Sequence, residues 1–156
     1  MTESISSRLN DLGLTLPPAP APVATYTPTL MSGNLLFISG QISKPANADI
    51  ITGTLGANLT LDDGIEAARV CALNILAQAN AALGNLDLIE HVARLNGFVC
   101  ATPDFTDHPK VINGASDLMV KILGDAGKHT RAAIGVASLP AGCAVEIDAI
   151  LVIKPT

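Results

Sequence analysis

The chain has 156 residues, a formal net charge of −5 and only 15% charged residues. This length suits one compact domain with a hydrophobic core. Because binding to nucleic acid or to an anionic membrane depends on basic patches, an acidic chain without a run of Lys or Arg argues against both kinds of partner. Hydrophobic residues make up 49% of the chain. Since monomers seldom leave large apolar patches in water, we expect a homo-oligomer.

The sequence carries no targeting or metal-binding signal. Its start lacks the basic and apolar stretches of a secretory signal, and no apolar run approaches the length of a membrane span, so we expect a cytoplasmic protein. Cys71, Cys100 and Cys143 are far apart, and no histidine is paired with another at ligand spacing. We therefore expect reduced thiols that pack as small hydrophobic side chains, and no metal site.

The N-terminal part of the chain is predicted to be a helix followed by an arm. Residues 5–12 place their apolar side chains on one helical face. Four prolines within residues 17–22 exclude a regular helix or a central strand there. We assign residues 1–22 to this helix and proline-rich arm, and residues 23–156 to a single domain.

A hairpin is predicted next, with strands over residues 24–31 and 35–39 joined by a tight Gly-Asn turn. Gly40 follows the second strand. Because glycine has no side chain, Gly40 permits a turn, a bulge or the close approach of a ligand.

Two amphipathic helices and three further strands complete the pattern. The helices are expected over residues 60–84, which open with a capping-box pattern, and 107–124, which carry a proline in the first turn. The strands are expected over residues 92–101, 131–138 and 144–153. The order strand, strand, helix, strand, helix, strand, strand predicts an α+β fold with its helices on one face of the sheet.

Charged side chains in the last two strands need an explanation, because an isolated buried charge is costly. Arg131 offers a planar fork of donors that suits a carboxylate or phosphate; alternatively, it forms a structural ion pair with Glu146 or Asp148. Glu146 is a candidate general base if burial raises its pKa, or else an exposed edge carboxylate. Asn113 and Tyr26 are candidate ligand contacts, although a local hydrogen bond and a partly buried strand aromatic are common roles for such residues.

Five features recur along the chain in a characteristic order: Ser39-Gly40-Gln41, Asn113, Arg131, Leu139-Pro140 and Val145 to Ile150. Together they resemble the Rid (reactive intermediate deaminase) family, also called YjgF-like or endoribonuclease L-PSP-like. The resemblance spans roughly residues 26–153 and implies a chorismate-mutase-like α+β fold with a mixed sheet and two main helices on one face. It also implies a homotrimer whose sheets form a central barrel with three clefts between subunits.

The resemblance assigns roles to individual residues. In the deaminase branch, the arginine that matches Arg131 holds the substrate carboxylate, and the glutamate that matches Glu146 positions the water that hydrolyses a 2-imino acid. Ala133 stands where many members have a cysteine, a position used mainly through its backbone. The N-terminal arm and residues 45–58 depart from the compact family pattern and indicate a longer subgroup. Three further positions match residues that line the pocket: Tyr26, Gly40 and Asn113.

The expected activity is hydrolysis of small reactive 2-imino acids to 2-keto acids and ammonia, without cofactor or metal. An imine carbon is electrophilic once protonated, so an anchored carboxylate, an aligned water and an acid-base group suffice. The alternative is a trimeric protein that binds a 2-keto acid without turnover. A ribonuclease suits the chain less well, because the sequence offers no basic stripe and no paired histidines.

Overall fold

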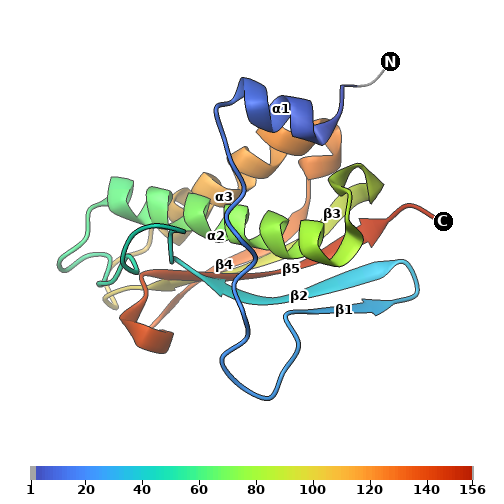
Figure 1. Ribbon diagram of the computed structural model, residues 1–156. Helices are drawn as coiled ribbons and strands as arrows, with labels where there is room; N and C mark the ends of the chain where they lie inside the picture. The colour runs from blue at the N-terminus through green and yellow to red at the C-terminus, as the bar shows by residue number, and fades with distance from the viewer. Residues whose placement is uncertain (1–2, 156) are drawn as a thin grey trace.

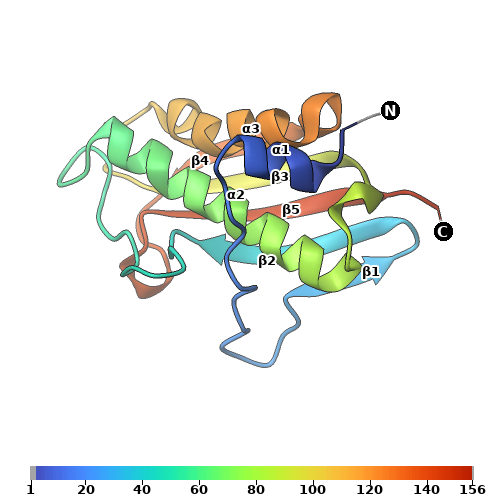
Figure 2. The ribbon, with the colours of Figure 1, turned by 45° about the horizontal axis from the view of Figure 1, so that its top comes forward.

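The computed structural model describes residues 3–155 and contains a five-stranded mixed sheet in the order β1-β2-β5-β3-β4. Neighbouring strands are antiparallel except β3 and β4, which are parallel. Figures 1 and 2 show α2 and α3 lying across one face of this sheet, with α1 beside α3. In the described residues the strands are β1 (Thr29–Ser32), β2 (Leu35–Ile42), β3 (Ile89–Cys100), β4 (Thr130–Val136) and β5 (Val145–Ile153), and the α-helices are α1 (Ile5–Asp11), α2 (Leu61–Leu83) and α3 (His108–Leu123).

The ends of the two long helices are fixed by local sequence, as predicted. The Thr60 side chain caps α2 by accepting a hydrogen bond from the backbone of Asp63, and the Asp63 carboxylate accepts one in return from the backbone of Thr60. Gly84 ends α2 in the left-handed conformation, with φ of 73°. Pro109 stands in the first turn of α3, where a missing N–H costs nothing.

The alternation of β5 decides which side chains face the helices. Val145, Ile147, Ala149, Leu151 and Ile153 are all buried. They form the core together with the apolar faces of α2 and α3. The intervening Glu146 and Asp148 therefore face the other side of the sheet, as the period of two requires.

The sequence-based boundaries of several strands need correction. The first strand begins at Thr29 rather than at residue 24, because Pro28 has no N–H to add to a strand ladder. The second continues through Gly40 to Ile42, with a shift of register between Ile38 and Gln41. The third begins at Ile89 rather than at residue 92, and β4 ends at Val136 rather than at residue 138.

The sheet face opposite α2 and α3, here called the uncovered face, carries exposed apolar side chains. Leu30 is 61% exposed, Phe37 39% and Ile134 47%. Pairing places Leu30 beside Phe37 and Ile134 beside Phe98 on this face. Figure 2 shows α1, α2 and α3 on the opposite side of the sheet. An apolar sheet face of this kind is typical of a surface that contacts another molecule.

The cysteines lie in the core. Cys71, Cys100 and Cys143 are buried and free, as predicted. Burial raises the pKa of Cys143 to about 11 and raises that of Cys71 well above its ordinary value.

In the described part of the chain, no helix has both the length and the apolar character needed to cross a bilayer.

Candidate functional site

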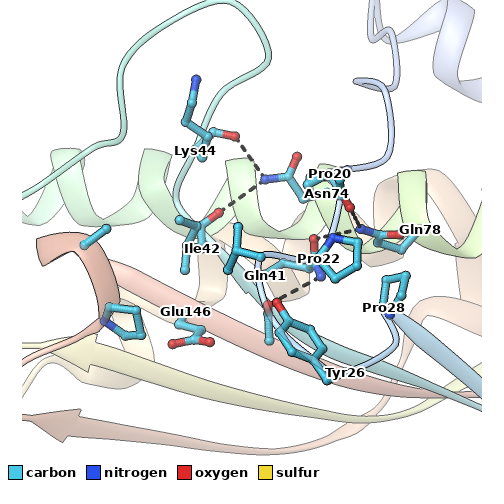
Figure 3. Close-up of a pocket in the computed structure, with 15 residues that line it drawn as sticks. Pro20, Pro22, Tyr26, Pro28, Gln41, Ile42, Lys44, Asn74, Gln78 and Glu146 are labelled. Carbon is cyan, nitrogen blue, oxygen red and sulfur yellow. Dashed lines mark hydrogen bonds between the residues drawn. The ribbon is translucent and has the colours of Figure 1, made fainter.

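A pocket of about 450 Å³ opens beside the end of β2, beyond Thr29, where the neighbouring strand β1 begins. Its walls come from the end of β2, the middle of α2, residues 20–23 where the N-terminal arm joins the domain, and residues 140–141. Three residues singled out in the sequence meet here: Tyr26, Gly40 and Glu146. Figure 3 shows Glu146 and the Tyr26 ring below a row of amide side chains from α2 and β2.

Glu146 reaches the pocket from the uncovered face of β5. Partial burial of its carboxylate raises its pKa above the ordinary value, and the negative charge of Asp148 adds to the effect. A raised pKa brings a carboxylate closer to the range in which it both takes and returns a proton near neutral pH. The electrostatics of this position therefore suit an acid-base group.

Gly40 makes room for that carboxylate. A Cβ atom at this position would collide with Oε1 of Glu146. Gly40 lies within the register shift of β2, where the strand departs from regular pairing with β5. The register shift agrees with the bulge foreseen for Gly40, and the group that approaches the glycine is the Glu146 side chain of the same chain.

Arg131 lies on the other side of the molecule, at the start of the edge strand β4. Its guanidinium donates hydrogen bonds to Oδ1 of Asn113 (2.9 Å), to Oγ of Ser116 (3.0 Å) and to the Pro109 carbonyl (3.4 Å). All three acceptors are uncharged. Within residues 3–155 the salt bridges do not involve Arg131, so the alternative role considered for it, an ion pair with Glu146 or Asp148, is not observed. Arg131 is held in place while its positive charge stays uncompensated.

A histidine supports this arrangement. His129 Nδ1 lies 2.6 Å from the Gly127 carbonyl, which can only accept, so we assign the proton to Nδ1. With a neutral ring, Nε2 then accepts from the Ser116 hydroxyl at 2.9 Å, and the Ser116 oxygen remains available to Arg131.

The fold of the single chain does not bring Arg131 and Glu146 together. Arg131 pairs with Leu95, and Ala133 pairs with Gly97, so both share the helix-covered face of the sheet. Glu146 faces the opposite side. Its strand, β5, is separated from β4 by β3, and two strand spacings alone place β5 and β4 roughly 10 Å apart. The candidate residues therefore form two half-sites: Arg131, Asn113 and Ala133 on one, and Tyr26, Gly40 and Glu146 on the other.

The pocket also contains residues that the sequence analysis missed. Gln41, Asn74 and Gln78 are buried polar residues that line it. The sequence did hold a signal, because Asn74 and Gln78 are four residues apart on the otherwise apolar face of α2. Among residues 3–155, no three His, Cys, Asp or Glu side chains gather in a way that could hold a metal ion.

A family model and several known sequences match this chain over most of its length. A protein-family model described as "YjgF/chorismate_mutase-like, putative endoribonuclease" matches residues 6–151. Protein TCP17 of Trypanosoma cruzi is 46% identical over 148 residues, which cover 94% of this chain and 92% of the relative. A 2-iminobutanoate/2-iminopropanoate deaminase of Dermatophagoides farinae is 26% identical over 142 residues, covering 90% of this chain and 95% of the relative.

Solved structures agree with the fold. The crystal structure of the protein Atu1372 from Agrobacterium tumefaciens is 47% identical with a TM-score of 0.89, covering 97% of this chain and 94% of that one. A crystal structure of a protein from Shewanella oneidensis MR-1 is 32% identical with a TM-score of 0.93, covering 97% of this chain and all of that one. Since the family model spans nearly the whole sequence and the fold agrees, this chain belongs to the YjgF/chorismate mutase-like family, also called the Rid family.

Proposed function

We propose that the protein hydrolyses small 2-imino acids to 2-keto acids and ammonia, without a cofactor, in clefts between the protomers of a homotrimer. The observation that carries this proposal is Arg131. Its guanidinium is oriented by three neutral acceptors and has no acidic partner in the described residues. A pre-oriented arginine of this kind suits the bidentate capture of a carboxylate.

The separation of the two half-sites supports an intersubunit cleft. Arg131 lies at the edge strand β4, whereas Glu146 opens into the pocket beside β2. If neighbouring protomers pack through the apolar uncovered face, the β4 edge of one protomer meets the pocket of the next. The substrate carboxylate then binds Arg131 of one protomer, and the imine carbon faces Glu146 of the other.

The chemistry requires few groups. The ionised Glu146 takes a proton from water as the water oxygen attacks the carbon of the imine, which is protonated on its nitrogen. This step gives a tetrahedral amino alcohol. Glu146 returns that proton to the nitrogen. The C–N bond then breaks as the hydroxyl passes its proton to the ionised Glu146, which gives the 2-keto acid and releases the nitrogen as ammonia. Glu146 finally loses this proton to solvent. A carboxylate with a raised pKa favours both directions of proton transfer.

The sequence similarity supports this reaction class. The relative from Dermatophagoides farinae, which matches along 90% of this chain, is named for the deamination of 2-iminobutanoate and 2-iminopropanoate. We assign the site to six residues: Arg131, Glu146, Tyr26, Gly40, Asn113 and Ala133.

Ammonia release tests the proposal. An imine such as 2-iminopropanoate is generated in the assay, and its hydrolysis is compared with the spontaneous rate for the wild type, Arg131→Ala and Glu146→Gln. We expect both substitutions to remove most of the acceleration, because one deletes the anchor and the other the base. Binding of 2-ketobutyrate to the wild type without any acceleration would instead establish the alternative, a binding protein without turnover.

Mixing the two inactive variants tests the intersubunit cleft. In a mixed trimer, an Arg131→Ala protomer still supplies Glu146, and a Glu146→Gln protomer still supplies Arg131. Random exchange of subunits then restores about a quarter of the wild-type rate, because most trimers regain one intact cleft. No recovery after proven subunit exchange would place both residues in a site within one protomer and would contradict the proposal.

A further inference from the structure

Three amide side chains form the wall of the pocket opposite Glu146. Gln41 is 7% exposed, Asn74 2% and Gln78 3%. All three line the pocket, and Figure 3 shows them in a row from the end of β2 to α2. Buried polar groups need hydrogen-bond partners, so the orientation of each amide reveals what it is prepared to bind.

The amide nitrogens donate hydrogen bonds to backbone carbonyls of the protein. Asn74 Nδ2 donates to the carbonyls of Ile42 (3.2 Å) and Lys44 (3.0 Å). Since a carbonyl can only accept, the Asn74 amide cannot be flipped without losing both bonds. Its oxygen must therefore lie on the side away from these two carbonyls.

The same argument orients the other two amides. Gln78 Nε2 donates to the Pro20 carbonyl of the N-terminal arm (2.6 Å) and lies 3.5 Å from Oε1 of Gln41. Gln41 Nε2 donates to the carbonyl of Ser39 (2.9 Å). Each nitrogen is thus fixed by a backbone carbonyl, and each oxygen is left on the opposite side.

The amide oxygens are left with little to accept. Asn74 Oδ1 and Gln78 Oε1 accept no hydrogen bond from residues 3–155, and Gln41 Oε1 has only the 3.5 Å contact with Gln78. Lys44 also lines the pocket; two of the three N–H groups of its ammonium donate to the carbonyls of Pro45 and Ala48, and Figure 3 shows this ammonium pointing away from the amides. The amide wall therefore presents hydrogen-bond acceptors that have no strong donor within the protein.

We propose that these oxygens form a subsite for the side chain of the substrate, and that the preferred side chain carries a hydrogen-bond donor such as a hydroxyl, ammonium or carboxamide NH₂ group. This specificity rests on the proposed function, since it assigns the reacting end to Glu146. A carboxylate side chain offers no donor and meets the negative Glu146 as well. A purely aliphatic side chain leaves the amide oxygens without a partner, which is costly in a buried wall.

Binding of three 2-keto acids that differ at the end of a two-carbon side chain tests the subsite without requiring turnover. The compounds are 4-hydroxy-2-oxobutanoate, 2-oxopentanoate and 2-oxoglutarate, whose side chains end in a hydroxyl, a methyl and a carboxylate. Calorimetric titration of the intact protein is expected to show at least roughly tenfold tighter binding of the hydroxyl compound than of either other acid. Equal affinities, or a preference for 2-oxopentanoate, would overturn the proposal.

A variant identifies the amides responsible. Gln78→Met keeps the length of the side chain and removes its amide; Asn80→Ala removes an exposed residue from the same helix and serves as the matched control. Gln78→Met is expected to reduce the preference for the hydroxyl compound several-fold, because it weakens binding of that compound and removes an unpartnered amide oxygen from the complex with 2-oxopentanoate. An unchanged preference, or an equal loss of affinity for all three acids, would remove Gln78 from the subsite.

The outcomes separate this inference from the proposed function. Hydroxyl-selective binding without imine hydrolysis would support the subsite and reject the deaminase. Imine hydrolysis with no selectivity among the corresponding imines, made from homoserine, norvaline and glutamate, would support the deaminase and reject the subsite.

Discussion

The guanidinium of Arg131 donates a hydrogen bond to the side-chain oxygen of Asn113 at 2.9 Å, which ties the edge strand β4 to helix α3. The amide is a neutral acceptor, so it orients the arginine without cancelling its charge. A carboxylate in the same place would form an ion pair and compete with any anionic ligand. The identity of residue 113 therefore controls whether Arg131 is available.

The pair Asn113→Ala and Asn113→Asp tests this relationship. Asn113→Ala leaves the acceptors from Ser116 and Pro109, and we expect about 2- to 10-fold weaker binding of 2-ketobutyrate. Asn113→Asp is nearly isosteric but introduces a charge, and we expect the larger loss. Titration calorimetry measures both. If the aspartate variant bound the keto acid as well as wild type, Arg131 would not be the carboxylate anchor.

Glu146→Gln is expected to separate activity from stability. Loss of the base should lower kcat by about 10²- to 10⁴-fold. Folding raises the pKa of Glu146, so at a pH between the ordinary and the raised pKa the folded protein binds more protons than the unfolded chain. The free energy of unfolding therefore falls as the pH rises through this range. The variant should therefore unfold at a higher temperature than wild type at about pH 7.5, and the difference should vanish at about pH 4. A lower melting temperature at neutral pH would show that the carboxylate stabilises the fold.

Asp148 should shift the pH profile of the reaction. Burial is the main cause of the raised pKa of Glu146, and the charge of Asp148 is the second. Because the base acts when ionised, kcat/KM should fall as pH drops through the pKa of Glu146. Asp148→Asn should move that acidic limb to lower pH, while Asn96, which donates to Asp148 at 2.6 Å, keeps a hydrogen-bonding partner. An acidic limb at the same pH in both proteins would assign the limb to another group.

Gly40→Ala should impair the reaction without unfolding the protein. The new methyl group would displace the Glu146 carboxylate, which is the free end of a flexible side chain, so the melting temperature should change little. We expect kcat to fall by about tenfold or more, because small displacements of a catalytic group are costly. In the double variant Gly40→Ala/Glu146→Gln, the first substitution should add almost no further loss. Additive losses would mean that Gly40 acts independently of Glu146.

The uncovered face should mediate assembly. Ile134→Glu places a charge among exposed apolar side chains of this face and should convert the proposed trimer to monomers, with loss of activity. Val120→Glu, on the exposed side of α3, is the matched control and should leave the trimer intact. Light scattering measures the mass of each protein in solution. A monomeric wild type, or an intact trimer of the Ile134 variant, would contradict this use of the face.

The sequence alone determined the local structure. The cap at Thr60, the glycine at position 84 and the alternation of β5 each depend on neighbours a few residues away, so periodicity and capping rules located these elements correctly. The family resemblance carried by Gly40, Asn113, Arg131 and Glu146 also followed from residue order. These signals are readable in a single chain because the interactions behind them are local.

Only the tertiary structure decided how the candidate residues are divided. The sequence placed Arg131 and Glu146 on adjacent predicted strands, where an ion pair between them was possible. In the fold, β3 lies between those strands, and strand pairing directs the two side chains to opposite faces of the sheet. Likewise, Gln78 meets Gln41 and the Pro20 carbonyl only because α2, β2 and the arm converge. Strand order and register arise from contacts between distant parts of the chain, which no local pattern records.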